Sequence, residues 1–285
     1  NVGKVQNQGV EFDVEAVLVS TKNIEWSVYG NITYVDGKVL RLPESYLKDD
    51  GTRWYAGSSY ILKEGGSLHQ AYMPEYAGVD AETGKALYYL DPADHSKGTT
   101  ATYSQDLAGD LGDISVKCYG GFGTSLNLYG VDLGIQFAYQ FGGKAYDGTY
   151  QEMMHAGDKP GHIWSVDILN AWTPENTETD VPRLCASDSY DQQTSSRWLV
   201  SSNYLSLNNV TVGYTLPSKW TNKIGVAKAR VYFQGDNLAL FSARQGYDPR
   251  QTQNALSYGV GISTSTGNFV YSLTRTFSGG ISISF

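Results

Sequence analysis

The sequence lacks the features that mark several large classes of protein. Nowhere does an apolar run reach the roughly 18 residues that a transmembrane helix needs, so spanning helices are excluded. The mean hydropathy of the 285-residue chain is -0.34. No long stretch keeps the helical period of about 3.6 residues, which argues against a helical bundle. Lys and Arg total 21 against 29 Asp and Glu, and the net charge of -8 argues against nucleic-acid binding.

Cysteine and histidine are scarce, which limits metal and catalytic chemistry. The 2 cysteines, Cys118 and Cys185, lie far apart; they form one disulfide or stay free, and we expect free thiols. The 4 histidines show neither a zinc-protease spacing nor a readable Ser-His-Asp order. No Walker lysine follows the glycine-rich stretch at 120–123. We therefore expect no enzymatic activity, no catalytic residue, no resident metal and no cofactor.

The sequence instead shows strict alternation, which is clearest in residues 271–285. Odd positions there are apolar except for Arg275 and Gly279, and even positions are small or polar. A period of two residues predicts a β-strand with one apolar and one polar face. The chain stops on Phe285. An aromatic end suits a transmembrane β-barrel, whose outer face meets lipid and whose inner face meets water.

Arg275 is the exception on the apolar side. A basic residue at the midplane of a bilayer costs about 2–4 kcal/mol. At ~3.3 Å per residue and a tilt near 45°, Arg275 lies about 23 Å in height from Phe285, and the apolar band is about 25 Å tall. We therefore expect Arg275 at the interface opposite Phe285. Tyr129 and Tyr139 share one apolar phase at a similar separation, so we expect them in the two aromatic belts.

Alternation predicts about nine strands in the whole chain. We expect them at 5–20, 24–35, 66–78, 86–90, 116–128, 131–142, 204–215, 227–236 and 271–285. In the first strand, Glu11, Asp13 and Glu15 share one face, and we interpret them as a solvated lumen wall rather than a catalytic cluster.

The connections between these strands alternate in length. Short ones are expected at 21–23, 79–85, 128–131 and 216–225, and long ones at 36–65, 91–115, 143–202 and 237–267. Bacterial outer-membrane barrels have short periplasmic turns and long extracellular loops. The sequence therefore predicts an all-β protein, a transmembrane antiparallel β-barrel of the outer membrane of a Gram-negative bacterium. Its long loops would be extracellular and its C-terminus periplasmic.

The expected number of strands indicates whether the chain forms a whole barrel or part of one. Single-chain bacterial barrels have even numbers of strands, and the sequence starts at Asn1 in mid-pattern without a signal peptide. We expect residues 1–285 to be the C-terminal part of a larger barrel. The plug and N-terminal domains would then lie outside this chain.

Several segments resemble one family of proteins. Residues 202–205 read SNYL and 208–217 read NNVTVGYTLP, followed by DNLALF at 236–241 and GYDP at 246–249. Earlier, QGVE at 8–11 and GVDAETG at 78–84 match in family order. Together they resemble the SusC/RagA family of TonB-dependent outer-membrane transporters of Bacteroidetes. The end of the chain resembles the signal read by the barrel-assembly machinery, with Ile283 where an aromatic residue is usual. The residues of that signal are Ser278, Gly280, Ile283 and Phe285.

The resemblance carries expectations about the whole protein. It implies a barrel of about 22 strands with an N-terminal plug and a segment that contacts TonB. It also implies a surface lipoprotein of the SusD type above the extracellular loops, and it allows a dimer of transporter–lipoprotein pairs. The substrates it implies are glycans or peptides, and the barrel would contact outer-membrane lipid.

Import of a bulky solute needs contact residues above the membrane. Sugars present apolar ring faces, so aromatic side chains on the expected extracellular loops are candidate ligand contacts. These are Trp54, Tyr55, Trp164, Trp172 and Trp198. The alternative is that they pack the loops together or contact the lipoprotein. Calcium could bind loop carboxylates such as Asp188 with Asp191, or Asp91 with Asp94, but no EF-hand pattern is present.

Two other classes of function stay open at this point. A passive porin or an adhesin-like barrel would share the strand pattern but have no plug. A secreted all-β domain that binds or hydrolyses glycans would be soluble without detergent. The paired acidic residues that a glycosidase needs cannot be located in the sequence.

Overall fold

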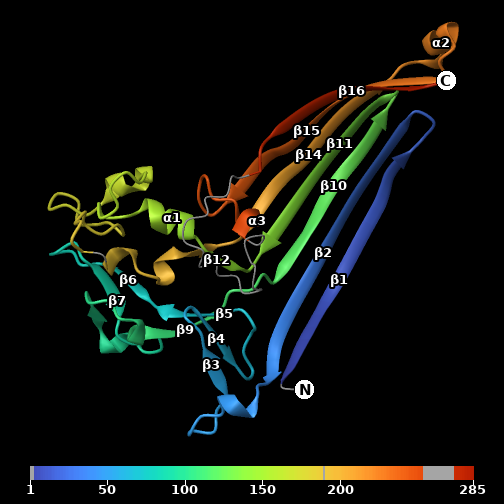
Figure 1. The fold of residues 1–285 in the computed structure, drawn as a ribbon. Helices are drawn as coiled ribbons and strands as arrows, with labels where there is room; N and C mark the ends of the chain where they lie inside the picture. Colours follow the sequence, from blue (N-terminus) through green and yellow to red (C-terminus); the bar gives the residue numbers. More distant parts are fainter. Residues whose placement is uncertain (1–2, 189, 253–272) are drawn as a thin grey trace.

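The computed structural model describes residues 3–188, 190–252 and 273–285. Its main feature is a seven-stranded sheet in the order β1-β2-β10-β11-β14-β15-β16, in which each strand is antiparallel to its neighbours (Figure 1). The strands are β1 (Lys4–Ser20), β2 (Ile24–Arg41), β10 (Cys118–Leu128), β11 (Val131–Phe141), β14 (Tyr204–Thr215), β15 (Lys228–Ser242) and β16 (Thr276–Ser284). The sheet is open, with β1 and β16 at its edges. The predicted all-β fold and partial barrel are confirmed.

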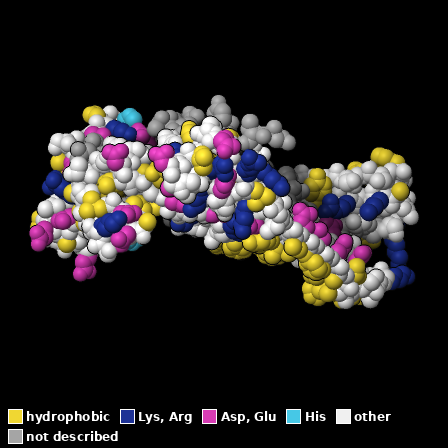
Figure 2. Space-filling model, turned by 90° about the horizontal axis from the view of Figure 1, so that it is seen from below, with side chains coloured by type: hydrophobic (Ala, Val, Ile, Leu, Met, Phe, Trp, Pro, Cys, Tyr) yellow, Lys and Arg dark blue, Asp and Glu magenta, His cyan; other side chains and the backbone are white. Residues whose placement is uncertain are grey.

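The register of this sheet gathers apolar side chains on one face. Phe12 is paired with Ile32, and Phe122 stacks on Phe137 with ring centroids 4.8 Å apart. Phe277 is 62% exposed and stacks on Phe233. Figure 2 shows hydrophobic side chains in a band along the sheet, with acidic side chains beside it. An apolar face this large and this exposed is typical of contact with lipid.

The connections of the sheet differ sharply between its two ends. At one end they are short: 21–23, Tyr129-Gly130, and 216–227 with α2 (Ser218–Thr221) and η7 (Asn222–Ile224). At the other end lie insert 1 (residues 42–117), insert 2 (residues 142–203) and the described parts of the connection between β15 and β16, residues 243–252 and 273–275 (Figure 1). In the hairpin of β10 and β11, Tyr129 has a φ of 50° and Gly130 one of 88°, as a two-residue turn requires.

Insert 1 corrects part of the strand prediction. The segments 66–78 and 86–90 form strands, but they pair within smaller sheets and not with the large one. Within the described residues the large sheet therefore has seven strands rather than about nine, and 79–85 is a turn inside the insert. The burial explains the difference: Gln70, Ala71, Met73 and Pro74 are buried on both faces of their strand, whereas a barrel strand is exposed to lipid on one.

The smaller elements are assigned as follows. Insert 1 holds η1 (Glu44–Tyr46), β3 (Trp54–Ala56), β4 (Tyr60–Lys63), β5 (Gln70–Pro74), β6 (Tyr76–Val79), β7 (Ala86–Tyr89), η2 (His95–Lys97), β8 (Thr99–Thr100), η3 (Gln105–Leu107) and β9 (Ala108–Asp113). Insert 2 holds β12 (Lys144–Tyr146), α1 (Gly148–Met153), η4 (Val166–Asn170), η5 (Tyr190–Gln192), η6 (Ser196–Trp198) and β13 (Leu199–Ser201). The last connection holds α3 (Pro249–Thr252). In the described part of the chain, no helix has the length and hydropathy to cross a membrane.

The hydrophobic core lies in the inserts and not in the sheet. Insert 1 contributes Ala71, Met73 and Ile114, and insert 2 contributes a larger share. The members from insert 2 are Tyr146, Met154, Ile168, Ala171, Val181 and Trp198. Because one core draws on both inserts, we treat them as a single folded unit, the loop layer.

Candidate functional site in the loop layer

The two inserts are joined by hydrogen bonds as well as by their core. The Trp172 Nε1 donates to the Ala81 carbonyl at 3.1 Å, and the Arg183 amide donates to the Gly84 carbonyl at 2.8 Å. The backbone of Gly84 has a φ of 70°, and a Cβ there would lie 2.4 Å from Cε3 of Trp172. Asp80 holds the turn by accepting from the Thr83 amide at 2.7 Å. Trp172 therefore helps to join the inserts, which is the alternative that the sequence left open for it.

Trp198 is not a ligand contact. Its side chain is fully buried, its Nε1 donates to the Gln193 carbonyl at 3.0 Å, and its ring meets Tyr150 edge-on with centroids 6.0 Å apart. The prediction that it binds substrate is wrong because this indole forms part of the core. Sequence alone could not separate it from the exposed tryptophans, since its contacts come from distant segments.

Trp54 and Tyr55 lie on neighbouring positions of β3 and so point to opposite faces. The Lys48 ammonium lies 4.3 Å from the ring centroid of Trp54. Trp54 lines a cavity of about 390 Å³. The other lining residues are Thr52, Arg53, Ile61, Lys63 and Glu64. Tyr55 is 38% exposed and its ring lies 5.2 Å from that of Tyr46. Both aromatic side chains are placed where a ligand could reach them, and their role stays a prediction.

Trp164 lies in insert 2 beside a buried histidine. Its Nε1 donates to the His155 carbonyl at 2.8 Å, and the two rings stack with centroids 5.1 Å apart. The indole is still 51% exposed, so one face is open to a ligand or a partner. Its role in ligand binding also stays a prediction.

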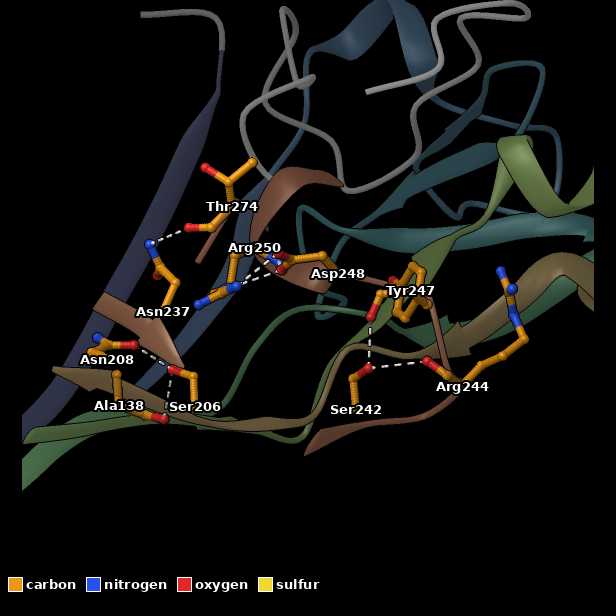
Figure 3. A network of polar contacts seen from close by, with 10 residues as sticks. All are labelled: Ala138, Ser206, Asn208, Asn237, Ser242, Arg244, Tyr247, Asp248, Arg250 and Thr274. Atoms are coloured by element: carbon orange, nitrogen blue, oxygen red, sulfur yellow. Dashed lines mark hydrogen bonds and ion pairs between the residues drawn. The ribbon is translucent and has the colours of Figure 1, made fainter. Parts of the chain in front are cut away.

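One arginine, Arg244, ties the last connection to the loop layer. Arg244 forms an ion pair with the buried Asp147, and its guanidinium lies 3.9 Å from the ring centroid of Tyr150. Asp147 also accepts from the Tyr150 amide at 2.9 Å and so caps α1. Figure 3 shows the nearby contacts: the Ser242 hydroxyl donates to the Tyr247 carbonyl at 2.6 Å. The sequence analysis missed this network because its partners are far apart in the chain.

The same segment borders a cleft of about 410 Å³. Asp248 accepts two hydrogen bonds from Arg250, at 2.8 and 2.7 Å. Arg275, just before β16, also lines the cleft. Nearby, the Asn237 Nδ2 donates to the Thr274 carbonyl at 3.4 Å (Figure 3). Arg275 is exposed, as its expected place at a membrane interface requires, but that place stays a prediction.

Asp191 is the most perturbed carboxyl of the loop layer. Burial raises its pKa to about 7, the nearby carboxylates of Asp188 and Asp158 add to the rise, and Arg197 opposes it. Asp191 is 6% exposed, and among the described residues its Oδ1 has no hydrogen-bond partner. Among the described residues no group of three His, Cys, Asp or Glu side chains is arranged to hold a metal ion.

The other predicted residues lie on the large sheet or its turns. Gly280 lies against Tyr232, and a Cβ there would lie 2.6 Å from Oη of that side chain. Ser278 pairs with Gln234, while Ile283 and Phe285 lie on the exposed apolar side. Tyr129 is 69% exposed in its turn, and the Tyr139 hydroxyl donates to the Asn31 carbonyl at 2.8 Å near the opposite end. Their roles in assembly and in the membrane belts stay predictions. Cys118 and Cys185 are free thiols, as expected.

Known proteins share this architecture. No protein-family model matches the chain. The whole chain aligns at 26% identity with 29% of TonB-dependent receptor P3 of Formosa agariphila. At 24% identity, 87% of the chain aligns with 24% of TonB-dependent receptor SusC of Bacteroides thetaiotaomicron. The solved RagAB peptide transporter matches the whole chain with a TM-score of 0.81 and 27% identity, over 30% of its own chain.

The chain is related to the SusC/RagA family of TonB-dependent transporters. It spans less than a third of the length of these relatives. These relatives are named as receptors and a transporter and not as enzymes. The open seven-stranded sheet is then part of a β-barrel similar to those of these TonB-dependent relatives.

Proposed function

We propose that residues 1–285 supply barrel wall and extracellular loops to a TonB-dependent active importer of glycans or oligopeptides. The observation that carries this proposal is the asymmetry of the sheet. Its connections at one end are short turns, and those at the other end build a layer with its own hydrophobic core. A barrel that only lets small solutes diffuse has no need of such a layer.

The same asymmetry supports an orientation in the membrane. Outer-membrane barrels have short turns on the periplasmic side. The loop layer therefore faces the outside of the cell, and the C-terminus at Phe285 faces the periplasm. The band of apolar side chains on the sheet meets lipid between these two levels (Figure 2).

The whole importer would need parts that residues 1–285 do not supply. A plug in the lumen and a segment that contacts TonB would come from the N-terminal side, and a SusD-like surface lipoprotein would cover the loop layer. Of the candidate ligand contacts, Tyr55 and Trp164 are exposed and Trp54 is half-buried beside a cavity, so these three are offered as contacts to substrate. Energy delivered through TonB would displace the plug, while this part of the wall stays in place.

The test is uptake by cells that make the full-length protein. Labelled oligosaccharides and labelled oligopeptides are supplied in parallel, with TonB present and with TonB removed. Active import predicts uptake of one class of substrate and its loss without TonB. Uptake that continues at the same rate without TonB would instead establish a passive porin, and no uptake of either class with TonB present would contradict import of these substrates.

A further inference from the structure

Insert 2 carries apolar side chains where a water-exposed loop has no use for them. Val166 is 74% exposed and Leu169 is 80% exposed, and the preceding Ile163 and Trp164 are 65% and 51% exposed. We call these residues the apolar ridge. Exposed apolar side chains grouped within a short segment mark an interaction site. The ridge belongs to the loop layer and not to the lipid-facing sheet (Figure 1).

The apolar ridge is held in a fixed conformation. Val166 and Leu169 are three positions apart in the 3-10 helix η4, so their side chains stand on the same side of it. Between them Ile168 is buried in the core. The Ser165 hydroxyl accepts from the Asp167 amide at 3.3 Å, and the Tyr150 hydroxyl donates to Asp167 Oδ2 at 2.9 Å. A surface that is already ordered loses little entropy on binding.

Acidic side chains lie on the segment that follows one end of the ridge. The segment after η4 folds back on its end: the Asn176 Nδ2 donates to the Asn170 carbonyl at 3.1 Å, and the Thr179 hydroxyl donates to the same oxygen at 2.6 Å. These bonds bring the segment that carries the exposed Glu175 and Glu178 to the C-terminal end of η4, where Leu169 lies. Within the described ranges, neither carboxylate forms an ion pair.

The negative charge of Glu175 and Glu178 indicates which kind of partner can bind the apolar ridge. A second copy of the chain would bring the same carboxylates against each other, and like charges across an interface are costly. Segments that lie on membranes pair their apolar side with Lys and Arg, not with carboxylates. What remains is a different protein whose surface has an apolar pocket bordered by basic side chains.

We propose that the apolar ridge is the docking element for the surface lipoprotein, which receives Val166 and Leu169 in an apolar pocket with a rim of Lys and Arg. This inference rests on the proposed function, because it takes the lipoprotein from there. It adds the residues that make the contact and the chemistry of the surface that receives them.

Binding of purified proteins tests the ridge. The full-length transporter in detergent is titrated with the lipoprotein encoded beside its gene, using wild type, the double variant Val166→Ser/Leu169→Ser, and Glu175→Lys/Glu178→Lys. Leu184→Ser is the matched control, because this leucine of the same insert is also exposed, at 49%. The ridge variant should bind roughly 10- to 100-fold more weakly. The charge-reversed variant should bind more weakly at low salt and approach wild type at high salt, and the control should match wild type.

The outcomes separate the two levels of the proposal. Equal binding by wild type and the ridge variant overturns the docking element but leaves the transporter–lipoprotein pair intact. Absence of binding by wild type overturns the pairing itself, and the ridge with it. Self-association of the transporter that the ridge variant abolishes would assign the ridge to a second copy and also overturn the proposal. Both substituted side chains are mostly exposed, so the ridge variant should fold normally. Heat-modifiable migration of the barrel checks this.

Discussion

Replacing Asp191 with Asn should change how the stability of the loop layer depends on pH. The buried carboxyl has a pKa raised to about 7 from an ordinary value of 3.8. Between these values the folded layer keeps a proton that the unfolded chain releases, so its stability falls as the pH rises from about 4 to about 7 and then levels off. The Asn side chain is uncharged at every pH, so the variant should not lose stability as the pH rises over this range.

The size of the effect follows from the shift. A difference of about three pKa units is worth about 4 kcal/mol at pH 8, as an order of magnitude. At pH 8 Asp191→Asn should therefore stabilise the layer by up to this amount, while at pH 4 it should differ little from wild type. Asp180→Asn is the control, because that side chain lies at an exposed position of the same insert.

Hydrogen exchange of the backbone amides in insert 2 measures this local free energy without unfolding the barrel. Exchange in wild type should slow as the pH is lowered from 8 to 5, after correction for the intrinsic effect of pH on exchange. The variant should show no such trend. Identical corrected profiles for wild type and Asp191→Asn would refute the argument, because the carboxyl would then not be protonated in the folded layer.

Three further predictions concern assembly and packing. Phe285→Ser should lower the amount of barrel in the outer membrane more than transport per assembled molecule, and normal amounts by heat-modifiable migration would contradict an assembly signal at this end. Arg244→Gln should destabilise the loop layer by about 3–5 kcal/mol, because it leaves the carboxylate of Asp147 buried without the charge that pairs with it. Adding Asp147→Asn should recover part of this loss in a double-mutant cycle. If the effects of the two substitutions simply add, the two residues are not a coupled pair. Gly84→Ala should cost about 1–3 kcal/mol more than Gly98→Ala in proteolysis-monitored stability, since both glycines have positive φ but only Gly84 faces an indole; equal costs would show that backbone strain alone matters.

The strands of the large sheet could be predicted because their cause is local. Lipid on one face and water on the other impose a period of two residues, which is visible in 271–285 without any knowledge of partners. The same rule misled in 66–78 and 86–90. There the short alternating pattern comes from strands packed inside the loop layer. A few residues of alternation cannot distinguish such a strand from one that faces lipid.

The candidate site was harder to predict because its contacts are long-range. Tryptophans on long connections all looked alike in the sequence, yet Trp198 is buried, Trp172 joins the inserts, and Trp164 is half exposed. The ion pair of Arg244 with Asp147 joins residues 97 positions apart, and no local pattern announces it. Alternation can place a side chain on a face of a strand, but it does not show which distant segment packs there.

The shared core of the two inserts constrains how this surface can be altered. Met73 of insert 1 packs in the same cluster as Ile168 of insert 2, so neither connection carries a complete interior of its own. A chimera that took only one insert from a relative would combine two half-cores that never evolved to fit. Grafting a new outer surface onto this barrel therefore means exchanging residues 42–117 and 142–203 as one cassette, and the two segments can be expected to have diversified together.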